Sequence, residues 1–417
     1  MRILPLNDKN AELILRRRVR SDAEAEGVAA RIIADVRKRG DAALFAWTRQ
    51  LDGNSLTPKT ICIGVSERRS GRRSVSPELF GALKRAARNI RRVAEAQRPH
   101  SWSMQVEPGV HVSQRVLPLE TIGCYVPGGR FSLVSTLLMT AIPARVAGVK
   151  RIVVACPRPN AVLLAAAELA GVEEILRIGG AQAIAAFAYG TKSVPPVDKI
   201  CGPGNRYVTA AKRLVSADCS IDMLAGPTEV LIAATRGEAR YIAADLIAQA
   251  EHDPDAVAVF VTTSRSLAKA VEESLAEELS TLPPTNLARR ALADNGVILL
   301  APNVGAMVRF ANRFAPEHLS VPGGEPALVK QLRTAGSVFI GPWSAQSIGD
   351  YASGTNHVLP TRGGARSRGG LSTWDFVRCT TVQQLSRAGL RSLAPVVSAL
   401  ADAEGLVAHR RDVEVRK

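Results

Sequence analysis

The feature that most constrains the fold is a regular alternation of short apolar runs with helical patterns from about residue 151 onward. The run RIVVAC (151–156) precedes a helical pattern, and EVLIAAT (229–235) precedes a helix expected from Arg240 to Glu251. Further apolar runs follow at AVAVFVTTS, GVILLAP and GSVFIG. Strands that alternate with helices of about 10–15 residues are typical of βαβ units and a mainly parallel sheet. The number of expected strands favours two sheets over one.

Helical patterns also flank this alternating region. Residues 76–97 predict one long helix that begins at Ser76-Pro77 and carries arginines on its outer face. The tail from Thr381 to Ala408 has leucines at roughly helical spacing and predicts a further helix. This tail could be an arm that packs on a partner or a helix folded back on its own domain.

The composition bounds the class of protein. At 417 residues with 46% hydrophobic residues, the chain can bury a large core and should form two or more domains. The start shows no signal-peptide pattern, and apolar stretches such as 161–170 are too short to span a membrane. We therefore expect a cytoplasmic protein without a membrane partner. The six cysteines form no C-x-x-C pair and predict free, mostly buried thiols.

The net charge of +16 raises the question of nucleic acid. Arginines cluster at 16–20 and across 67–92, but aromatic residues make up only 4% of the chain and hardly interleave with them. Stacking platforms for single strands are therefore lacking. A solvated basic surface is the favoured interpretation, and it could steer anionic ligands such as a dinucleotide.

Two polar segments carry the first candidate catalytic residues. Gln249 and His252 lie three positions apart at the end of an expected helix, which would place both on one face. The alternative is a polar helix end, where the helix dipole favours His. Glu317 and His318 precede an apolar strand and form a candidate acid/base pair, whose side chains would point to opposite sides of extended backbone. The alternative is two exposed loop residues.

A third polar segment, 349–360, contains Asp350 and His357 around a glycine-rich run. A carboxylate and an imidazole are hard and borderline metal ligands, and glycines allow tight turns between them. Three of only six histidines fall in these three segments, and His409 follows near the C-terminus. Such bunching favours a functional site.

Signals for phosphate binding are weaker. The sequence has no G-x-G-x-x-G motif and no P-loop. Glycine turns at Gly128-Gly129, Gly179-Gly180 and Gly202-Pro-Gly204 each lie beside a helix start. Three such turns on one side of a parallel sheet would suit a nucleotide outside the strand ends, although a tight turn between strand and helix is the ordinary role of each glycine.

Taken together, these segments resemble the histidinol dehydrogenase family over nearly the whole chain. The matching segments are YVPGG (125–129), IGGAQAIAAFAYG (178–190), VDKICGPGN (197–205), IDMLAGPTEVLIAA (221–234), QAEHD (249–253), PEHL (316–319), GDYASGTNHVLPT (349–361) and AEGLVAH (403–409). Several long motifs in order are more specific than any single fingerprint.

The resemblance implies a four-electron oxidation of L-histidinol to L-histidine through L-histidinaldehyde, with NAD+ as co-substrate and one Zn²⁺ per subunit. In this reading His318 takes the alcohol proton and serves again as base in the second oxidation. Glu317 activates the water that hydrates the aldehyde. Zinc holds the substrate without carrying the hydride, and its ligands would be Gln249, His252, Asp350 and, from the other subunit of a homodimer, His409.

The resemblance also assigns binding residues and an organisation of the chain. It implies substrate contacts at Thr228, Gln249, His252, His318, Asp350, His357, Glu404 and His409, and NAD contacts at Tyr125, Gln182 and Asn205. The expected fold is α/β, with two Rossmann-like domains of mainly parallel sheets, a small N-terminal helical segment and a C-terminal helical tail. The expected parts are an N-terminal arm (1–20), a larger domain (21–124 with 230–371), a second domain (125–229) and a tail that reaches the partner subunit (372–417).

Two positions depart from the family pattern. Thr228 stands where many members have Ser, and its extra methyl could narrow the pocket. The segment 362–370 is more basic and richer in glycine than in many members. Relatives that oxidise other small alcohols, such as sulfonated diols, therefore remain an alternative, and a nucleic-acid-binding protein is a remote one. The presence of Glu404 and His409 favours histidinol.

Overall fold

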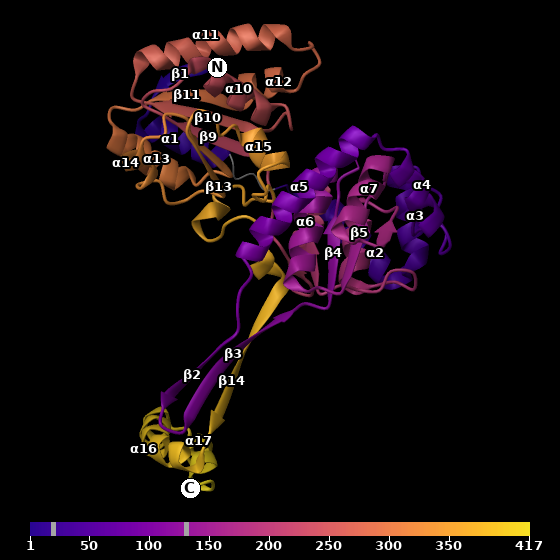
Figure 1. Ribbon diagram of the computed structural model, residues 1–417, viewed down its shortest axis with the longest axis vertical. Coiled ribbons are helices and arrows are strands. Elements are labelled where there is room, and N and C mark those ends of the chain that lie inside the picture. The colour runs from indigo at the N-terminus through magenta and orange to yellow at the C-terminus, as the bar shows by residue number, and fades with distance from the viewer. Residues whose placement is uncertain (18–21, 129–132) are drawn as a thin grey trace.

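The computed structural model describes residues 1–17, 22–128 and 133–417. Part of the arginine cluster at 16–20, the end of the expected N-terminal arm and Gly129 of the first glycine turn therefore lie outside the described residues. Two parallel sheets, each packed with helices, form two bodies, and a thin arm extends away from both (Figure 1).

The first body is built on a five-stranded parallel sheet of order β6-β5-β4-β7-β8. Its strands are β4 (Thr121–Tyr125), β5 (Arg151–Ala155), β6 (Glu174–Leu176), β7 (Lys199–Cys201) and β8 (Ser220–Ile221). The helices between them are α6 (Val134–Ala147), α7 (Ala161–Ala170), α8 (Gly180–Tyr189) and α9 (Arg206–Val215). Four earlier helices pack on these: α2 (Ala23–Arg39), α3 (Asp41–Asp52), α4 (Val65–Arg73) and α5 (Pro77–Ala96).

The second body is built on a six-stranded parallel sheet of order β1-β11-β10-β9-β12-β13. Its strands are β1 (Arg2–Pro5), β9 (Glu229–Ala233), β10 (Val257–Thr262), β11 (Gly296–Leu300), β12 (His318–Val321) and β13 (Ser337–Ile340). One face packs against α10 (Ala239–Ala250), α11 (Arg265–Thr281) and α12 (Ala288–Asn295). The other packs against α1 (Asp8–Arg17), α13 (Val304–Phe314) and α14 (Pro326–Val329). The short α15 (Gln346–Tyr351) lies beside α10.

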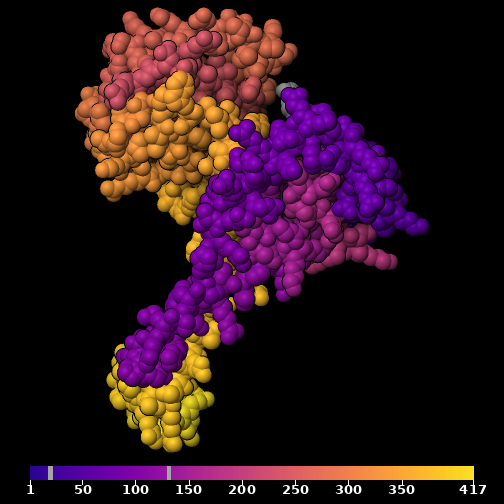
Figure 2. All heavy atoms as spheres, viewed as in Figure 1, coloured from indigo at the N-terminus to yellow at the C-terminus, as the bar shows by residue number. Residues whose placement is uncertain are grey.

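The arm is an antiparallel sheet of β2 (Trp102–Glu107), β3 (Val110–Pro118) and β14 (Val377–Leu385). At its tip lie α16 (Arg387–Glu404) and α17 (Val407–Glu414), with the C-terminus beside them (Figure 1). The space-filling view shows the arm standing clear of the two bodies (Figure 2). Its exposed apolar side chains include Trp102, Met104, Val396, Leu400 and Val407.

The prediction of an α/β fold with mainly parallel sheets is confirmed, as is the long helix over 76–97. Of the six cysteines, four are buried and all are free, as expected. Across the described residues, no helix combines the length and apolarity that a membrane crossing would need.

Three local expectations differ from the structure. The N-terminal segment begins with a strand, β1, which extends the six-stranded sheet at β11. Residues 381–385 belong to β14 and not to a helix, because β3 supplies the backbone partners for this segment. Residues 23–96 pack against the five-stranded sheet, whereas they were expected to group with 230–371. Each difference arises from pairing or packing between segments far apart in the sequence, which local patterns do not report.

Candidate active site

Glu317 and His318 lie at the amino end of β12, where it runs beside β9 in the middle of the six-stranded sheet. The helix α13 ends at Phe314, and the next residue, Ala315, has a positive φ of 48° that turns the chain toward the strand. Both side chains are almost fully enclosed, at 7% and 4% exposure. The alternative of two exposed loop residues is therefore wrong for this pair.

The Glu317 carboxylate is held by the segment that leads into β9. Its Oε2 accepts hydrogen bonds from Thr228 Oγ1 at 2.6 Å and from the Glu229 N–H at 2.8 Å. Gln249 Nε2 donates in turn to the Thr228 hydroxyl, so an amide, a hydroxyl and a carboxylate form one chain. Burial raises the pKa of Glu317, against the opposing effects of His318 and these donors.

His318 is oriented by groups on both sides of its ring. Its Nδ1 lies 3.2 Å from the Glu229 carbonyl oxygen, and because a carbonyl can only accept, Nδ1 carries the proton in this arrangement. Its Nε2 lies 3.7 Å from Asp350 Oδ1, and the ring stacks on Phe339. Burial alone would lower the pKa of His318, but the carboxylates of Glu317 and Asp350 raise it on balance.

The two members of the pair are close without bonding directly. His318 Nδ1 lies 3.7 Å from Glu317 Oε2, which is longer than a hydrogen bond. The two side chains were expected to point to opposite sides of extended backbone, but they approach each other because Glu317 lies in a bend just before β12 begins. Each is free to face a different substrate atom.

Asp350 and His357 approach His318 from the segment after β13. Asp350 lies in α15, and its backbone carbonyl oxygen is 3.0 Å from His357 Nδ1. Burial would raise the pKa of Asp350, but the nearby imidazoles of His318, His357 and His252 lower it on balance. Burial lowers the pKa of His357.

Gln249 and His252 both lie near this group, but not on one helix face as expected. Gln249 is buried in the last turn of α10, whereas His252 lies beyond the helix end and is exposed. His252 is close enough to Asp350 and His357 to influence the pKa of both. The structure thus brings together Gln249, His252, Asp350 and His318 from three separate segments.

The donors that come together here suit a zinc ion in type. In the part of the chain that the structure describes, no group of three or more His, Cys, Asp or Glu could hold a metal. Gln249 contributes an amide, His252 an imidazole and Asp350 a carboxylate, which together form a borderline-hard N/O set. His409 lies on α17 and Glu404 at the end of α16, both exposed at the arm's tip.

The three candidate dinucleotide residues gather at the carboxyl edge of the five-stranded sheet. Tyr125 ends β4, and its hydroxyl accepts a hydrogen bond from the Gly180 N–H at 3.1 Å. Burial raises the pKa of Tyr125 to about 12. Asn205 follows β7 and caps α9, where its Oδ1 accepts from two backbone N–H groups at 3.0 and 3.1 Å.

Gln182, on α8, completes this group. It is fully buried, and its Nε2 donates to Asp52 Oδ2 at 3.1 Å. Its Oε1 is buried without a hydrogen-bond partner among the described residues. A buried acceptor without a donor is costly, so a ligand that donates a hydrogen bond would suit this position.

A hollow of about 340 Å³ lies beside this group, at the carboxyl end of β5. It is lined by Gly53, Asn54, Ser55, Leu56, Pro157, Arg158, Pro159 and Arg177. Burial raises the pKa of the neighbouring Asp52, while Arg158 acts in the opposite direction. Sequence reasoning did not find Asp52 or Arg158, because neither belongs to a motif and only the packing of α3 brings Asp52 to this edge.

The basic segment 362–370 is engaged within the protein. The Arg362 N–H donates to Glu229 Oε1 at 3.1 Å, and Arg366 donates to the Arg313 carbonyl at 2.6 Å. Arg368 donates to Asp375 Oδ1 at 2.7 Å. The segment therefore anchors neighbouring loops, which its composition alone did not indicate.

Comparisons with known proteins agree with this geometry. A family model described as histidinol dehydrogenase matches residues 15–417. The chain is 46% identical to the histidinol dehydrogenase of Methanothermobacter thermautotrophicus, over 96% of this chain and 95% of that protein. It is also 46% identical to the histidinol dehydrogenase of Rhizobium meliloti, over 98% of this chain and 95% of that protein.

A solved structure gives the same result for the fold. The crystal structure of histidinol dehydrogenase from Elizabethkingia anophelis matches with a TM-score of 0.95 and 34% identity, over all of this chain and 98% of that one. Sequence and structure comparisons thus cover the two bodies and the arm alike. The chain belongs to the histidinol dehydrogenase family and is an oxidoreductase.

Proposed function

We propose that this enzyme oxidises L-histidinol to L-histidine in two NAD+-dependent steps through L-histidinaldehyde, as a step of histidine biosynthesis. The observation that carries the proposal is the enclosed Glu317–His318 pair, held by Thr228, Glu229 and Asp350 in a chain of this family. The family match favours neither a sulfonated diol as substrate nor a nucleic-acid-binding role.

His318 is the residue to accept the alcohol proton. The Glu229 carbonyl holds the Nδ1 proton, which leaves Nε2 with a lone pair on the side of Asp350. An oxidation that removes hydride from carbon must also remove a proton from oxygen, and an imidazole is suited to that task near neutral pH. The same Nε2 would accept a proton again from the hydrated aldehyde in the second step.

Glu317 is the residue to activate water for that hydration. One carboxylate oxygen, Oε2, is occupied by the Thr228 hydroxyl and the Glu229 N–H. These donors orient the carboxyl group and leave Oε1 for a water molecule. Enclosure of the pair would keep the reactive aldehyde from escaping into solvent between the two steps.

Gln249, His252 and Asp350 would hold one Zn²⁺ per subunit, with His409 as a further ligand. When bound, zinc would fix the substrate's imidazole and amino groups beside His318. The hydrogen bond from Gln249 to Thr228 ties this ligand set to Glu317. His357, Glu404 and Thr228 would contact the substrate directly.

Tyr125, Gln182 and Asn205 would bind NAD+, which supplies the hydride acceptor for each oxidation. They lie at the carboxyl edge of a parallel sheet, the usual place for a dinucleotide. The free Oε1 of Gln182 and the adjacent hollow with Arg158 support this assignment. Glycine turns that pack tightly against Pro157 stand here in place of the usual G-x-G-x-x-G motif. A Cβ on Gly128 or Gly179 would come within 2.8 Å of Pro157.

A homodimer with shared sites would bring His409 and Glu404 to the substrate. Both residues lie at the tip of an arm that stands clear of its own two bodies (Figure 2). Exposed apolar side chains on the arm, such as Leu400 and Val407, would be covered by the partner.

The test is a panel of amino alcohols and diols assayed for NADH formation with metal-free and zinc-loaded enzyme. We expect two NADH per histidinol, loss of activity after chelation and recovery with zinc. Folded, zinc-loaded enzyme that fails to turn over histidinol, or that prefers another alcohol, would contradict the proposal. Calorimetric titration with NAD+ alone separates failure of dinucleotide binding from failure of the chemistry.

A further inference from the structure

A buried ion pair lies outside the catalytic groups described above. Lys212 on α9 pairs with Asp222 just after β8, and the two residues are only 2% and 3% exposed. Lys212 Nζ also donates to the Gly202 carbonyl oxygen at 2.9 Å, and the Gly202 N–H donates to Asp222 Oδ2 at 2.7 Å. The pair therefore holds both polar backbone atoms of Gly202.

Gly202 needs this support because its backbone is unusual and tightly packed. Its φ is +110°, and a Cβ there would lie 2.1 Å from the Tyr125 carbonyl oxygen. The turn 202–205 is thus pressed against the end of β4 and leads directly to Asn205. Two of the residues proposed to bind NAD+ owe their relative position to this turn.

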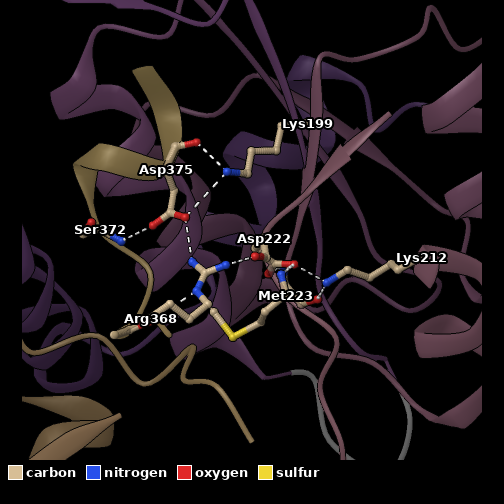
Figure 3. Close-up of polar contacts among 9 residues, drawn as sticks. Lys199, Lys212, Asp222, Met223, Arg368, Ser372 and Asp375 are labelled. Atoms are coloured by element: carbon tan, nitrogen blue, oxygen red, sulfur yellow. Dashed lines mark hydrogen bonds and ion pairs between the residues drawn. The ribbon is translucent and has the colours of Figure 1, made fainter. Parts of the chain in front are cut away.

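Arg368 connects the ion pair to the base of the arm. Its guanidinium donates to the Asp222 carbonyl oxygen and to Asp375 Oδ1 (Figure 3). Lys199 on β7 donates to the Asp375 carbonyl oxygen at 2.8 Å, and Asp375 precedes β14 by two residues. A buried network of this kind favours one arrangement of its loops over others.

The same segment also reaches the catalytic pair. Thr361 accepts a hydrogen bond from the Gly226 N–H at 2.6 Å, and the Arg362 N–H donates to Glu229. Residues 361–368 therefore contact the linker that leads to Thr228 and, through Arg368, they contact Asp222, which in turn holds Gly202 of the 202–205 turn.

We propose that Arg368 is a positioning residue that ties the 202–205 turn to the base of the arm and thereby sets the affinity for NAD+. The inference rests on the proposed function, since it takes Tyr125 and Asn205 as dinucleotide contacts. Arg368 is suited to this role because its planar guanidinium donates in two directions at once, whereas a lysine would donate from one point.

The first test is Arg368→Met in the full-length enzyme. We expect the Kd and KM for NAD+ to rise about tenfold, the effect of losing one charge-assisted hydrogen bond. The KM for histidinol, kcat at saturating NAD+ and the zinc content should stay close to wild type. Arg368→Lys should recover part of the affinity. Arg366→Met is the matched control, since Arg366 is in the same segment and, among the described residues, donates only to the Arg313 carbonyl.

The second test is non-additivity. Asp375→Asn removes the negative charge that pairs with Arg368, so it should weaken NAD+ binding in the same direction, and the double variant should be no weaker than Arg368→Met alone. A wild-type Kd for NAD+ in Arg368→Met would overturn the proposal. Additive effects of the two substitutions in the double variant would also overturn it, as would equal changes in the KM for NAD+ and the KM for histidinol. Wild-type enzyme that binds NAD+ but does not oxidise histidinol would overturn only the proposed reaction, because the Kd comparison still decides the role of Arg368.

Discussion

The two parallel sheets share one strand order but carry their candidate sites at opposite edges. In the five-stranded sheet, β4 lies in the middle, with β5 and β6 on one side and β7 and β8 on the other. In the six-stranded sheet, β9 has the same place, with β10 and β11 on one side and β12 and β13 on the other. There β1 adds one further strand beside β11. In the five-stranded sheet, Tyr125, Gln182 and Asn205 lie at the carboxyl ends of the strands. In the six-stranded sheet, Thr228, Glu317 and His318 lie at the amino ends.

This difference shows that strand order alone does not determine whether a site forms at the carboxyl ends or at the amino ends of the strands. Ligands usually bind outside the carboxyl ends of parallel strands, where loops and helix N-termini meet. At the amino edge of β9 and β12 the chemistry is supplied instead by segments from elsewhere: the end of α10, α15 and the 361–368 segment. The linker from the first body enters β9 at this edge, so Asp222, which holds the 202–205 turn, and Thr228, which holds Glu317, are close in sequence.

The largest expected effect comes from replacing His318, at the amino ends of the strands in the six-stranded sheet. His318→Gln should lower kcat about a thousandfold, since the amide cannot accept the alcohol proton and general base catalysis contributes 10²–10⁴-fold. Affinity for NAD+ at the other sheet should not change. Steady-state kinetics and NAD+ titration of the same preparation check both points. A variant that keeps more than a tenth of wild-type kcat would remove His318 from the base role.

The second prediction concerns the arm, which is not part of either parallel sheet. His409→Ala should lose zinc and activity while both bodies stay folded. Mixed with His318→Gln, it should recover roughly one quarter of wild-type activity, because random pairing in a two-fold dimer leaves one intact site in half of the dimers. Subunit exchange is followed with a tag on one variant. Exchange without recovery would mean that the site is not shared, and wild-type zinc content would mean that His409 is no ligand.

A smaller effect is expected where Thr228 joins Gln249 to Glu317. Thr228→Val keeps the shape of the side chain but removes the hydroxyl that bonds to Glu317 and Gln249. An unsatisfied buried polar group costs about 1–3 kcal/mol. We therefore expect kcat/KM for histidinol to fall about 10–100-fold. Thr228→Ser is the matched control and should stay near wild type. If Ser instead improves KM for histidinol strongly, the extra methyl narrows the pocket.

The smallest expected effect is a change in stability, not in catalysis, when Asp245 on α10 is replaced. Burial raises the pKa of Asp245 to about 6, so the folded state holds this proton more tightly than the unfolded chain does. Stability therefore falls as pH rises from about 4 to about 6, and the penalty persists above. Asp245→Asn should stabilise the protein by about 3 kcal/mol at pH 8 and by little at pH 4. Thermal unfolding at both pH values checks this, and equal effects at the two pH values would contradict it.

Much of the candidate site could be predicted because its residues stand in long motifs. Glu317 and His318 are adjacent in sequence, and Asp350 and His357 share one short segment. Asp52, Glu229 and the Lys212–Asp222 pair escaped prediction, because each is an ordinary charged residue in its own segment. Their importance comes from burial and partners supplied by distant parts of the chain.

The sequence by itself determined the α/β class, the family and the chemistry of the candidate groups, since periodicity and motif order are local properties of the chain. Tertiary structure alone decided which edge of each sheet carries a site, that residues 23–96 join the five-stranded sheet, and that residues 381–385 form a strand. These outcomes depend on burial and hydrogen bonding between segments far apart in sequence, whose free energy exceeds local preference. The arm, with His409 at its tip, is the clearest case: β14 exists because β3 lies beside it.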